Sequence, residues 1–232
     1  MGKIDLEAIR RSLAPVEKTE TKSEDGTQKT KFGYWKPVIR SKPYMVRVLP
    51  VVDEQGIPAT TVQYYDKPLV QQRIVAPHQY GLPDPIKDHF EVVRKEKGKE
   101  VWDYAKNFQS KPKHYVVLLD RDAPEPDTPL LWEINDKLRA KILQKLVDPE
   151  YDDVLNPQEG FDFKVTVSQA IKDGKPDTFN NYPVKDFTID FARKSSPLSK
   201  SGKVEDTQAI LDGLPADLSE MFRGFAKYNT EE

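Results

Sequence analysis

Aromatic and basic side chains are interleaved along one stretch of the sequence, between residues 94 and 115. Cations bind phosphate groups, and flat aromatic rings stack on exposed bases at about 1–3 kcal/mol per base. The pattern therefore favours a site for single-stranded nucleic acid. The alternative is that Trp102 and Tyr115 belong to the core and that the lysines form a solvated face. The stretch contains Arg94, Lys95, Lys97, Lys99, Trp102, Tyr104, Lys106, Phe108, Lys111, Lys113, His114 and Tyr115.

Residue patterns for other chemistries are absent from the sequence. The glycines form neither a Walker-type loop nor a GxGxxG motif, and Ser195, Ser196 and Ser199 lie in a polar loop with no neighbouring base. The chain has no Cys, which excludes disulfides, Cys-ligated zinc and thiol catalysis. A metal set formed by His78, Asp84, Asp88 and His89 is conceivable, but loop and surface histidines are the simpler interpretation. We therefore expect a protein that is not an enzyme and holds no metal or cofactor.

Charge is distributed unevenly along the 232 residues, although the formal net charge is only −2. Residues 31–115 carry 15 Lys and Arg against 9 Asp and Glu, whereas residues 204–232 carry 2 against 7. A basic body with an acidic end is typical of a polyanion-binding protein whose tail competes with its ligand. Ordinary fluctuation in such counts is the alternative.

The sequence gives no sign of a membrane or secreted protein. Its longest wholly aliphatic run is Val116–Leu119, far below the roughly 20 residues of a membrane helix. The first 13 residues are charged and lack the apolar stretch of a secretory signal. We expect an intracellular protein that does not contact a membrane.

Strand patterns predominate after residue 32, where a polar, apolar-poor segment ends. The clearest strand is 160–171, in which apolar and polar residues alternate; the clearest helix is 136–147, whose apolar residues recur on one face. We also expect strands at 44–49, 59–65, 69–75, 115–119, 130–134 and 184–191, and helices at 4–13, 86–97 and twice within 204–228, with a break near 213–215.

A strand at 130–134, a helix at 136–147 and a strand at 160–171 match the OB-fold, a five-stranded Greek-key barrel with one helix between its third and fourth strands. The expected fold is mostly β with some α: an OB-fold core, an inserted subdomain and C-terminal helices. Its parts are a flexible N-terminal helix and arm (1–31), the core (32–203) with the insertion at about 66–110, and an acidic helical segment (204–232).

Four segments, in order, resemble the single-stranded DNA-binding (helix-destabilising) proteins of T-even-like bacteriophages. The resemblance covers residues 32–198, most of the chain. Its motifs are Tyr34-Trp35-Lys36 with Val46-Arg47-Val48-Leu49-Pro50 and Asp53-Glu54-Gln55; Asp120-Arg121-Asp122-Ala123-Pro124; Asp136-Lys137-Leu138 and Lys141-Ile142 leading to Glu159-Gly160; and Phe179-Asn180-Asn181-Tyr182 with Phe187.

The resemblance implies an OB-fold core that binds single-stranded DNA in a basic, aromatic-lined cleft. It also implies cooperative self-association along the DNA through the N-terminal segment, and contacts of the acidic C-terminal part with phage replication proteins. Such a protein coats and protects single-stranded DNA during phage DNA replication, recombination and repair, in the cytoplasm of the infected host cell. The alternatives are an OB-like adaptor that binds protein and a relative that binds RNA.

The expected DNA contacts combine the resemblance with the basic and aromatic pattern. Arg47 resembles a cleft arginine of the family, and Lys111 and Lys113 precede its central strand. Phe179 and Tyr182 match an aromatic pair beside the DNA; a packed cluster with Phe187 is the alternative. The full expected set is Arg47, Arg73, Lys95, Lys97, Lys99, Trp102, Tyr104, Lys106, Lys111, Lys113, Tyr115, Arg121, Phe179 and Tyr182.

The sequence departs from the resemblance at the zinc ligands. The phage proteins of the T-even type hold zinc with one His and three Cys. Where they have a Cys-Pro-x-Cys knuckle, this chain has Asp84-Pro85-Ile86-Lys87, and the His position corresponds to Tyr64 or Tyr65. Without thiolates that zinc site is excluded, so we expect packing to hold the subdomain. The candidates are Tyr64, Tyr65, Ile74, Tyr80, Leu82 and Phe90.

Overall fold

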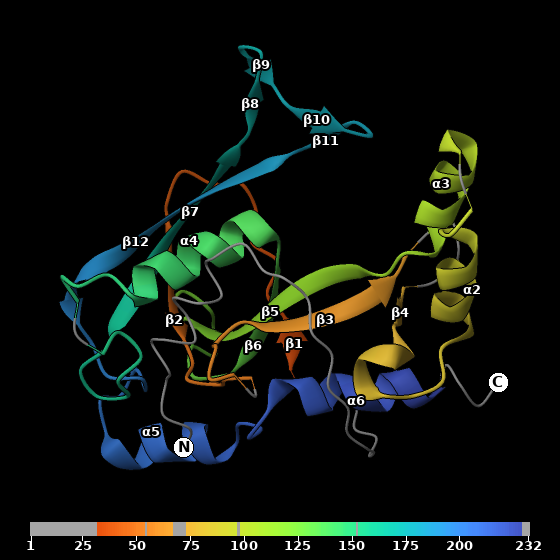
Figure 1. Ribbon diagram of the computed structural model, residues 1–232. Helices are drawn as coiled ribbons and strands as arrows, with labels where there is room; N and C mark the ends of the chain where they lie inside the picture. The colour runs from red at the N-terminus through yellow and green to blue at the C-terminus, as the bar shows by residue number, and fades with distance from the viewer. Residues whose placement is uncertain (1–31, 54, 67–72, 97, 152, 229–232) are drawn as a thin grey trace.

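The computed structural model describes residues 32–53, 55–66, 73–96, 98–151 and 153–228. The expected N-terminal helix and arm, residues 1–31, lie outside these ranges. About 31% of the chain is strand and 27% is helix, so the fold is mixed α/β, with a larger helical share than we expected. A large sheet carries helices around it and a projecting pair of hairpins (Figure 1). No helix among the described residues is long and apolar enough to cross a membrane.

An eight-stranded sheet organises the described part of the molecule, and β5 (Lys111–Asp120) pairs with three of its strands, more than any other strand does. The order is β1-β6-β5-β2-β7-β12, with β3 beside β5 and β4 beside β3. One edge of β5 pairs with β6, and the other pairs first with β3 and then with β2. Among the strand pairs of the described residues, β1–β6 alone is parallel. The other strands are β1 (Gly33–Tyr34), β2 (Tyr44–Val48), β3 (Thr60–Tyr65), β4 (Ile74–Val75), β6 (Leu130–Ile134), β7 (Phe161–Gln169) and β12 (Lys185–Ser195).

The predicted strands agree with these elements at most positions. Those at 44–49, 59–65 and 130–134 match β2, β3 and β6 within one residue. The strand predicted at 115–119 begins four residues earlier, because its basic start pairs with β3. Of the strand predicted at 69–75, only residues 74–75 fall within the described strand β4, since residues 67–72 lie outside the described ranges.

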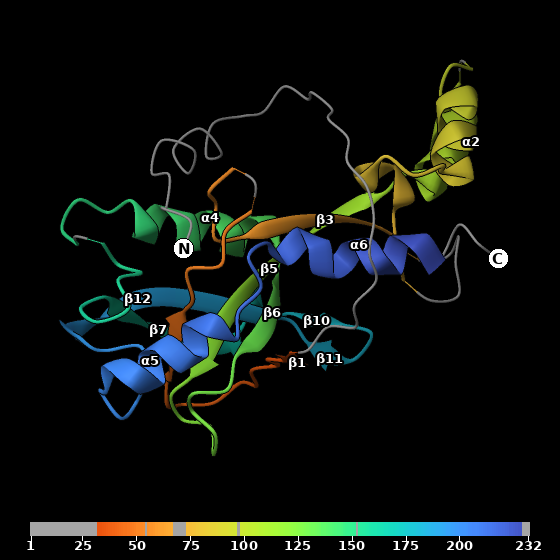
Figure 2. The same ribbon diagram turned by 90° about the horizontal axis from the view of Figure 1, so that it is seen from below.

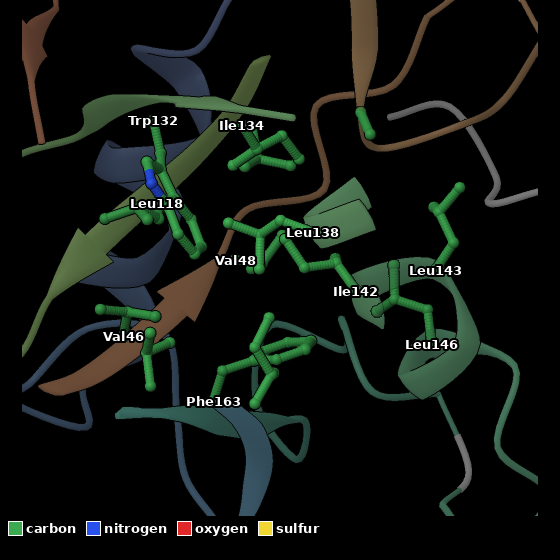
Figure 3. Close-up of a cluster of buried hydrophobic side chains, with 14 of the residues drawn as sticks. Val46, Val48, Leu118, Trp132, Ile134, Leu138, Ile142, Leu143, Leu146 and Phe163 are labelled. Atoms are coloured by element: carbon green, nitrogen blue, oxygen red, sulfur yellow. The ribbon is translucent and has the colours of Figure 1, made fainter. Parts of the chain in front are cut away.

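Helix α4 (Asp136–Leu146) covers one face of the sheet. The Asn135 side chain accepts a hydrogen bond from the Leu138 amide at 2.9 Å, which satisfies a free N–H group at the helix start. Leu138, Ile142 and Leu146 point toward buried side chains of β2, β5, β6 and β7 (Figure 3). Each such side chain stabilises the fold by about 1.5–3 kcal/mol when it is fully buried. This burial explains why the helix predicted at 136–147 forms here.

The C-terminal segment covers the opposite face of the sheet. It forms α5 (Val204–Asp212) and α6 (Leu218–Tyr228), which confirms the two predicted helices and their break. α6 runs along β3 on the side away from α4 (Figures 1 and 2). Its Phe222 ring lies 4.6 Å from the Tyr115 ring, and both side chains are buried in a second apolar cluster. The acidic segment therefore contributes to the core of the folded body.

Asp162 on β7 holds two largely buried arginines beneath the sheet. Arg121 reaches this carboxylate from the end of β5, with Nη2 at 3.0 Å, and Arg47 reaches it from β2, with Nη1 at 3.6 Å. Arg121 also donates to the Pro197 carbonyl at 2.8 Å, which attaches the chain leading to α5. Removing one partner of such a buried pair costs about 3–5 kcal/mol, so this carboxylate links three parts of the fold.

A lobe of short helices is inserted between β4 and β5, at the right of Figure 1. We call residues 77–108 the helical lobe. It comprises η1 (Pro77–Tyr80), α2 (Pro85–Val93), α3 (Lys99–Ala105) and η2 (Lys106–Phe108). The single helix predicted at 86–97 ends earlier, and α3 was not predicted. Gly98 separates the two helices with a φ of 131°, a value that only glycine adopts readily.

Two small hairpins project from the end of the β7–β12 ribbon, at the top of Figure 1. They are β8 (Ile171–Lys172) with β9 (Lys175–Pro176), and β10 (Thr178–Phe179) with β11 (Tyr182–Pro183). Their turns have positive φ at Asp173-Gly174 and Asn180-Asn181, as tight hairpin turns require. Three backbone hydrogen bonds join Ala170, Asp177 and Val184 in a cycle, at 2.7–3.0 Å. This cycle fixes both hairpins to the ribbon.

The first prediction concerns Gly160, at the start of β7. A Cβ atom there would lie 2.3 Å from the Val154 carbonyl oxygen and 2.6 Å from Arg47 Nη2. We expect Gly160→Ala to lower the free energy of unfolding by about 1–3 kcal/mol, because an overpacked site must shift its backbone. Chemical denaturation checks this. Gly33→Ala is the matched control, since its nearest neighbour would be a Leu130 methyl group at 3.4 Å.

The second prediction concerns the attachment of α6. Truncation of a buried Phe to Ala costs about 3–5 kcal/mol. We expect that loss for Phe222→Ala, with faster amide exchange in α6 and β3. Val204→Ala, at an exposed position of α5, should change the free energy of unfolding by less than about 0.5 kcal/mol. Equal stabilities of the Phe222→Ala and unsubstituted proteins would contradict the packing of α6 on the sheet.

Candidate nucleic-acid interface

The β10–β11 hairpin presents two aromatic rings to solvent. Phe179 and Tyr182 are register partners across the hairpin and are 72% and 76% exposed. The packed cluster with Phe187 does not form among the described contacts, because Phe187 lies against Trp132, with ring centroids 5.8 Å apart. The neighbouring hairpin exposes Lys172. We call Phe179 and Tyr182 the tip aromatic pair; it offers two exposed π-faces on the hairpin that follows the one carrying Lys172.

The helical lobe presents a second exposed aromatic pair. Trp102 and Tyr104 on α3 are both exposed. Lys106 lies over the Trp102 ring at 5.8 Å and pairs with Asp103 at 2.8 Å. Lys95 and Lys99 are exposed on the same lobe, whereas Lys97 lies outside the described residues. The structure therefore brings Lys95, Lys99, Trp102, Tyr104 and Lys106 together on one lobe.

A buried carboxylate attaches the helical lobe to the sheet. Asp84 accepts hydrogen bonds from the Tyr65 hydroxyl at 2.8 Å and from the Lys87 amide at 3.0 Å, and it lies 2.6 Å from His78 Nδ1. Burial by itself raises the pKa of Asp84, but these hydrogen bonds outweigh burial and lower it below the ordinary value. Polar contacts thus join the packing that we expected to hold this lobe.

All six residues expected to pack beneath the lobe are at least partly buried. Tyr64, Tyr65 and Tyr80 are buried, and Ile74, Leu82 and Phe90 are partly buried. His89 packs against Phe108, with ring centroids 4.6 Å apart, rather than joining Asp84. Among the described residues, no group of three or more His, Asp and Glu side chains is arranged to hold a metal.

A third group lies where β5 leaves the helical lobe. Glu133 on β6 forms ion pairs with two cations. Arg73 Nη1 lies 2.7 Å from one carboxylate oxygen, and Lys113 Nζ lies 3.4 Å from the other. Tyr34 on β1 has an exposed side chain; partial burial and the negative charge of Glu133 raise its pKa above the ordinary value, and the charge of Arg73 opposes this shift. We call Tyr34, Arg73, Lys113 and Glu133 the Glu133 cluster. Lys111 is exposed at the start of the same strand.

Three residues expected to contact DNA lie inside the fold instead. Arg47 is fully buried and donates to the Asn156 carbonyl at 2.6 Å; burial lowers its pKa to about 10, although Asp162 opposes that shift. Arg121 binds Asp162 and two backbone carbonyls. The buried Tyr115 donates to the Tyr64 hydroxyl at 3.1 Å, and burial raises its pKa. These three side chains therefore stabilise the fold and do not belong to the candidate interface.

The sequence reasoning missed Tyr34 and Glu133. Tyr34 occurs in the sequence only as part of one motif of the resemblance, and an acidic side chain is not expected to bind the DNA backbone. A signal for Glu133 was present, because it interrupts the apolar strand 130–134 with a charge. Its register partner on β5 is Tyr115, two residues from Lys113 and therefore on the same face.

No protein-family model matches this chain, and no curated protein sequence matches it. The likeness to the phage proteins rests on the four motifs alone.

The third prediction concerns the Asp84 attachment. Asn at this position can still cap α2 but lacks the charge that strengthens its hydrogen bonds, so Asp84→Asn should lower the local stability of α2 by about 1–3 kcal/mol. Because the folded-state pKa of Asp84 is lowered, its contribution is present above the ordinary Asp pKa and is lost as the pH falls through the folded value.

Amide exchange of α2 between pH 6 and pH 3 provides the measurement. Protection in the unsubstituted protein should fall on acidification, and protection in Asp84→Asn should start lower and depend less on pH. Asp88→Asn, at an exposed position of α2, is the matched control. Identical α2 protection in the Asp84→Asn and unsubstituted proteins at pH 6 would show that the carboxylate does not hold the lobe.

Proposed function

We propose that this protein binds single-stranded DNA without catalysing a reaction. The observation that carries the proposal is the exposure of four large aromatic side chains on two parts of the molecule that also expose lysines: Phe179, Tyr182, Trp102 and Tyr104. Aromatic rings of this size are usually buried, and exposed rings next to cations suit a ligand with flat bases and phosphates. Duplex DNA hides the faces of its bases, so exposed rings favour a single strand over a duplex.

The pairing of the sheet supports an OB-like assignment, which forms part of this proposal. In chain order, β2, β5, β6, β7 and β12 would be the five barrel strands, with pairs β2–β5, β5–β6, β2–β7 and β7–β12. α4 follows the third strand, as the OB-fold requires. The described ladders do not join β6 to β12, but Trp132 and Phe187 contact each other across that side. The helical lobe and the two hairpins would then extend the loops that bind ligand in this fold.

The biological role that we propose follows from the resemblance to the phage proteins. The protein would coat and protect single-stranded DNA during phage replication, recombination and repair in the host cytoplasm. Self-association along the DNA and contacts with replication proteins belong to the same proposal. An RNA-binding relative or a protein-binding adaptor would use the same exposed rings, so the ligand must be tested directly.

The fourth prediction separates stacking from charge. Titration of the protein with oligo(dT) at two salt concentrations gives the affinity and its salt dependence. Tyr182→Ala should weaken binding by about 1–3 kcal/mol with little change in the salt slope, because a stacked ring carries no charge. Lys111→Ala should reduce the slope of log K against log salt by about 0.7, the value for one phosphate neutralised on a single strand.

Controls identify the polymer and the chemistry. Tyr182→Phe keeps the ring and should bind like the unsubstituted protein, and oligo(U) should compete more weakly than oligo(dT). Stronger binding of oligo(U) would favour the RNA-binding alternative. Absence of binding to either polymer at low salt would overturn the proposed function, and unchanged affinity of a folded Tyr182→Ala variant would remove that ring from the site.

A further inference from the structure

The Glu133 cluster places one carboxylate between two cations on a solvent-accessible part of the sheet. Arg73 Nη1 and Lys113 Nζ approach opposite oxygens of Glu133 at 2.7 and 3.4 Å. The side chains of Arg73, Lys113 and Glu133 are 38%, 30% and 32% exposed. All three are therefore accessible to a ligand, yet both cations already have an anionic partner.

The surroundings hold this carboxylate in place. The Tyr115 hydroxyl, in the second apolar cluster, lies 3.3 Å from a Glu133 carboxylate oxygen, and Arg73 Nε pairs with Asp66 at 2.9 Å. Because Asp66 binds a different edge of the guanidinium, Arg73 retains a partner without Glu133. The Arg73 group also lies 5.6 Å over the Tyr64 ring. Removing the charge of Glu133 would therefore take one anionic partner from Arg73 and one from Lys113, without releasing the Arg73 side chain from the sheet.

A carboxylate and a backbone phosphate compete for the same guanidinium and ammonium donors. Any phosphate that binds Arg73 or Lys113 must either displace Glu133 or bind in a field weakened by its negative charge. The exposed rings of Tyr34 and of the helical lobe lie on elements adjoining this position, since β1 pairs with β6 and the lobe leads directly into β5. The Glu133 cluster therefore lies where the backbone of a single-stranded DNA stacked on these rings could reach Arg73 and Lys113.

We propose that Glu133 is an internal competitor for the DNA backbone, which limits affinity by occupying Arg73 and Lys113 in the free protein. This inference rests on the proposed binding of single-stranded DNA and adds a residue that sets its strength. When DNA binds, a phosphate replaces Glu133 as the partner of Arg73 and Lys113. Binding is then weaker, and depends less on salt, than it would be if both cations were unpaired in the free protein. Single-stranded DNA bound in this way is released more readily than DNA bound to unpaired cations.

The fifth prediction tests this exchange with Glu133→Gln. Glutamine keeps the length and an oxygen acceptor for Tyr115 and Arg73, so the fold should persist, which thermal unfolding verifies. Affinity for oligo(dT) at low salt should rise about two- to fivefold, the range expected for a partly exposed ion pair. The slope of log K against log salt should steepen by about 0.7 for each additional phosphate that the protein neutralises.

Two further proteins complete the experiment. Asp190→Asn removes the same charge from a pair with Lys145 (3.7 Å) on β12 and α4, and should leave affinity and slope nearly unchanged. In a protein that carries both Arg73→Gln and Lys113→Gln, the effect of Glu133→Gln should vanish, because no cation remains for it to release.

The outcomes distinguish this inference from the proposed function. If oligo(dT) binds the unsubstituted and Glu133→Gln proteins equally, with the same salt slope, Glu133 is not a competitor and single-stranded DNA binding still stands. Weaker binding by a folded Glu133→Gln protein would also overturn the inference, because it would mean that Glu133 positions the cations for the ligand. Absence of oligo(dT) binding by both proteins would overturn both statements.

Discussion

The buried carboxylate of Asp162 is the contact on which the arrangement of this molecule depends. Two arginines converge on it, Arg47 from β2 and Arg121 from the end of β5. Desolvation of these charges is expensive, and only close pairing together with further acceptors offsets it. The carbonyl groups of residues 156, 197 and 198 are such acceptors, although Arg47 Nε and Nη1 are buried without a hydrogen-bond partner among the described residues. The ion cluster therefore sets the path of the loop before β7 and of the chain that enters the C-terminal helices, as well as the alignment of two central strands.

Strand β5 connects this internal framework to the candidate interface. Its odd-numbered side chains share one face: Leu119 and Val117 are buried beneath α6, Tyr115 is buried with a hydroxyl that reaches Glu133, and Lys113 and Lys111 emerge at the surface. The apolar core thus passes without interruption into a charged site along a single strand. Because β3, β2 and β6 all pair with this strand, the positions of its lysines are set by the same ladder that holds the sheet together.

Periodicity predicted the elements whose burial repeats regularly. The alternation in 160–171 and the apolar face of 136–147 correspond to β7 and α4, because each buries one side against a large core. Local pattern could not predict α3, whose aromatic residues remain exposed, or the small hairpins, which bury almost nothing. It also could not tell a buried arginine from a surface one: Arg47 and Arg121 acquire their environment from Asp162, more than 40 residues away in sequence. The aromatic residues on the helical lobe, by contrast, are identifiable from the basic and aromatic pattern of residues 94–115, whereas Phe179 and Tyr182 are singled out only by the resemblance to the phage proteins.

The cyclic junction of Ala170, Asp177 and Val184 bears on how such a protein can diversify. All its hydrogen bonds lie within 15 residues of sequence, and the two hairpins beyond it pair only within themselves in the described ladders. Short hairpins of this kind form locally within about 1–10 μs and do not delay the assembly of a sheet with distant pairings. Insertions, deletions and substitutions beyond the junction are therefore separated from the folding of the body. The tip can change length and ring content from one descendant to another while the sheet, its two helical layers and their buried charges stay as they are.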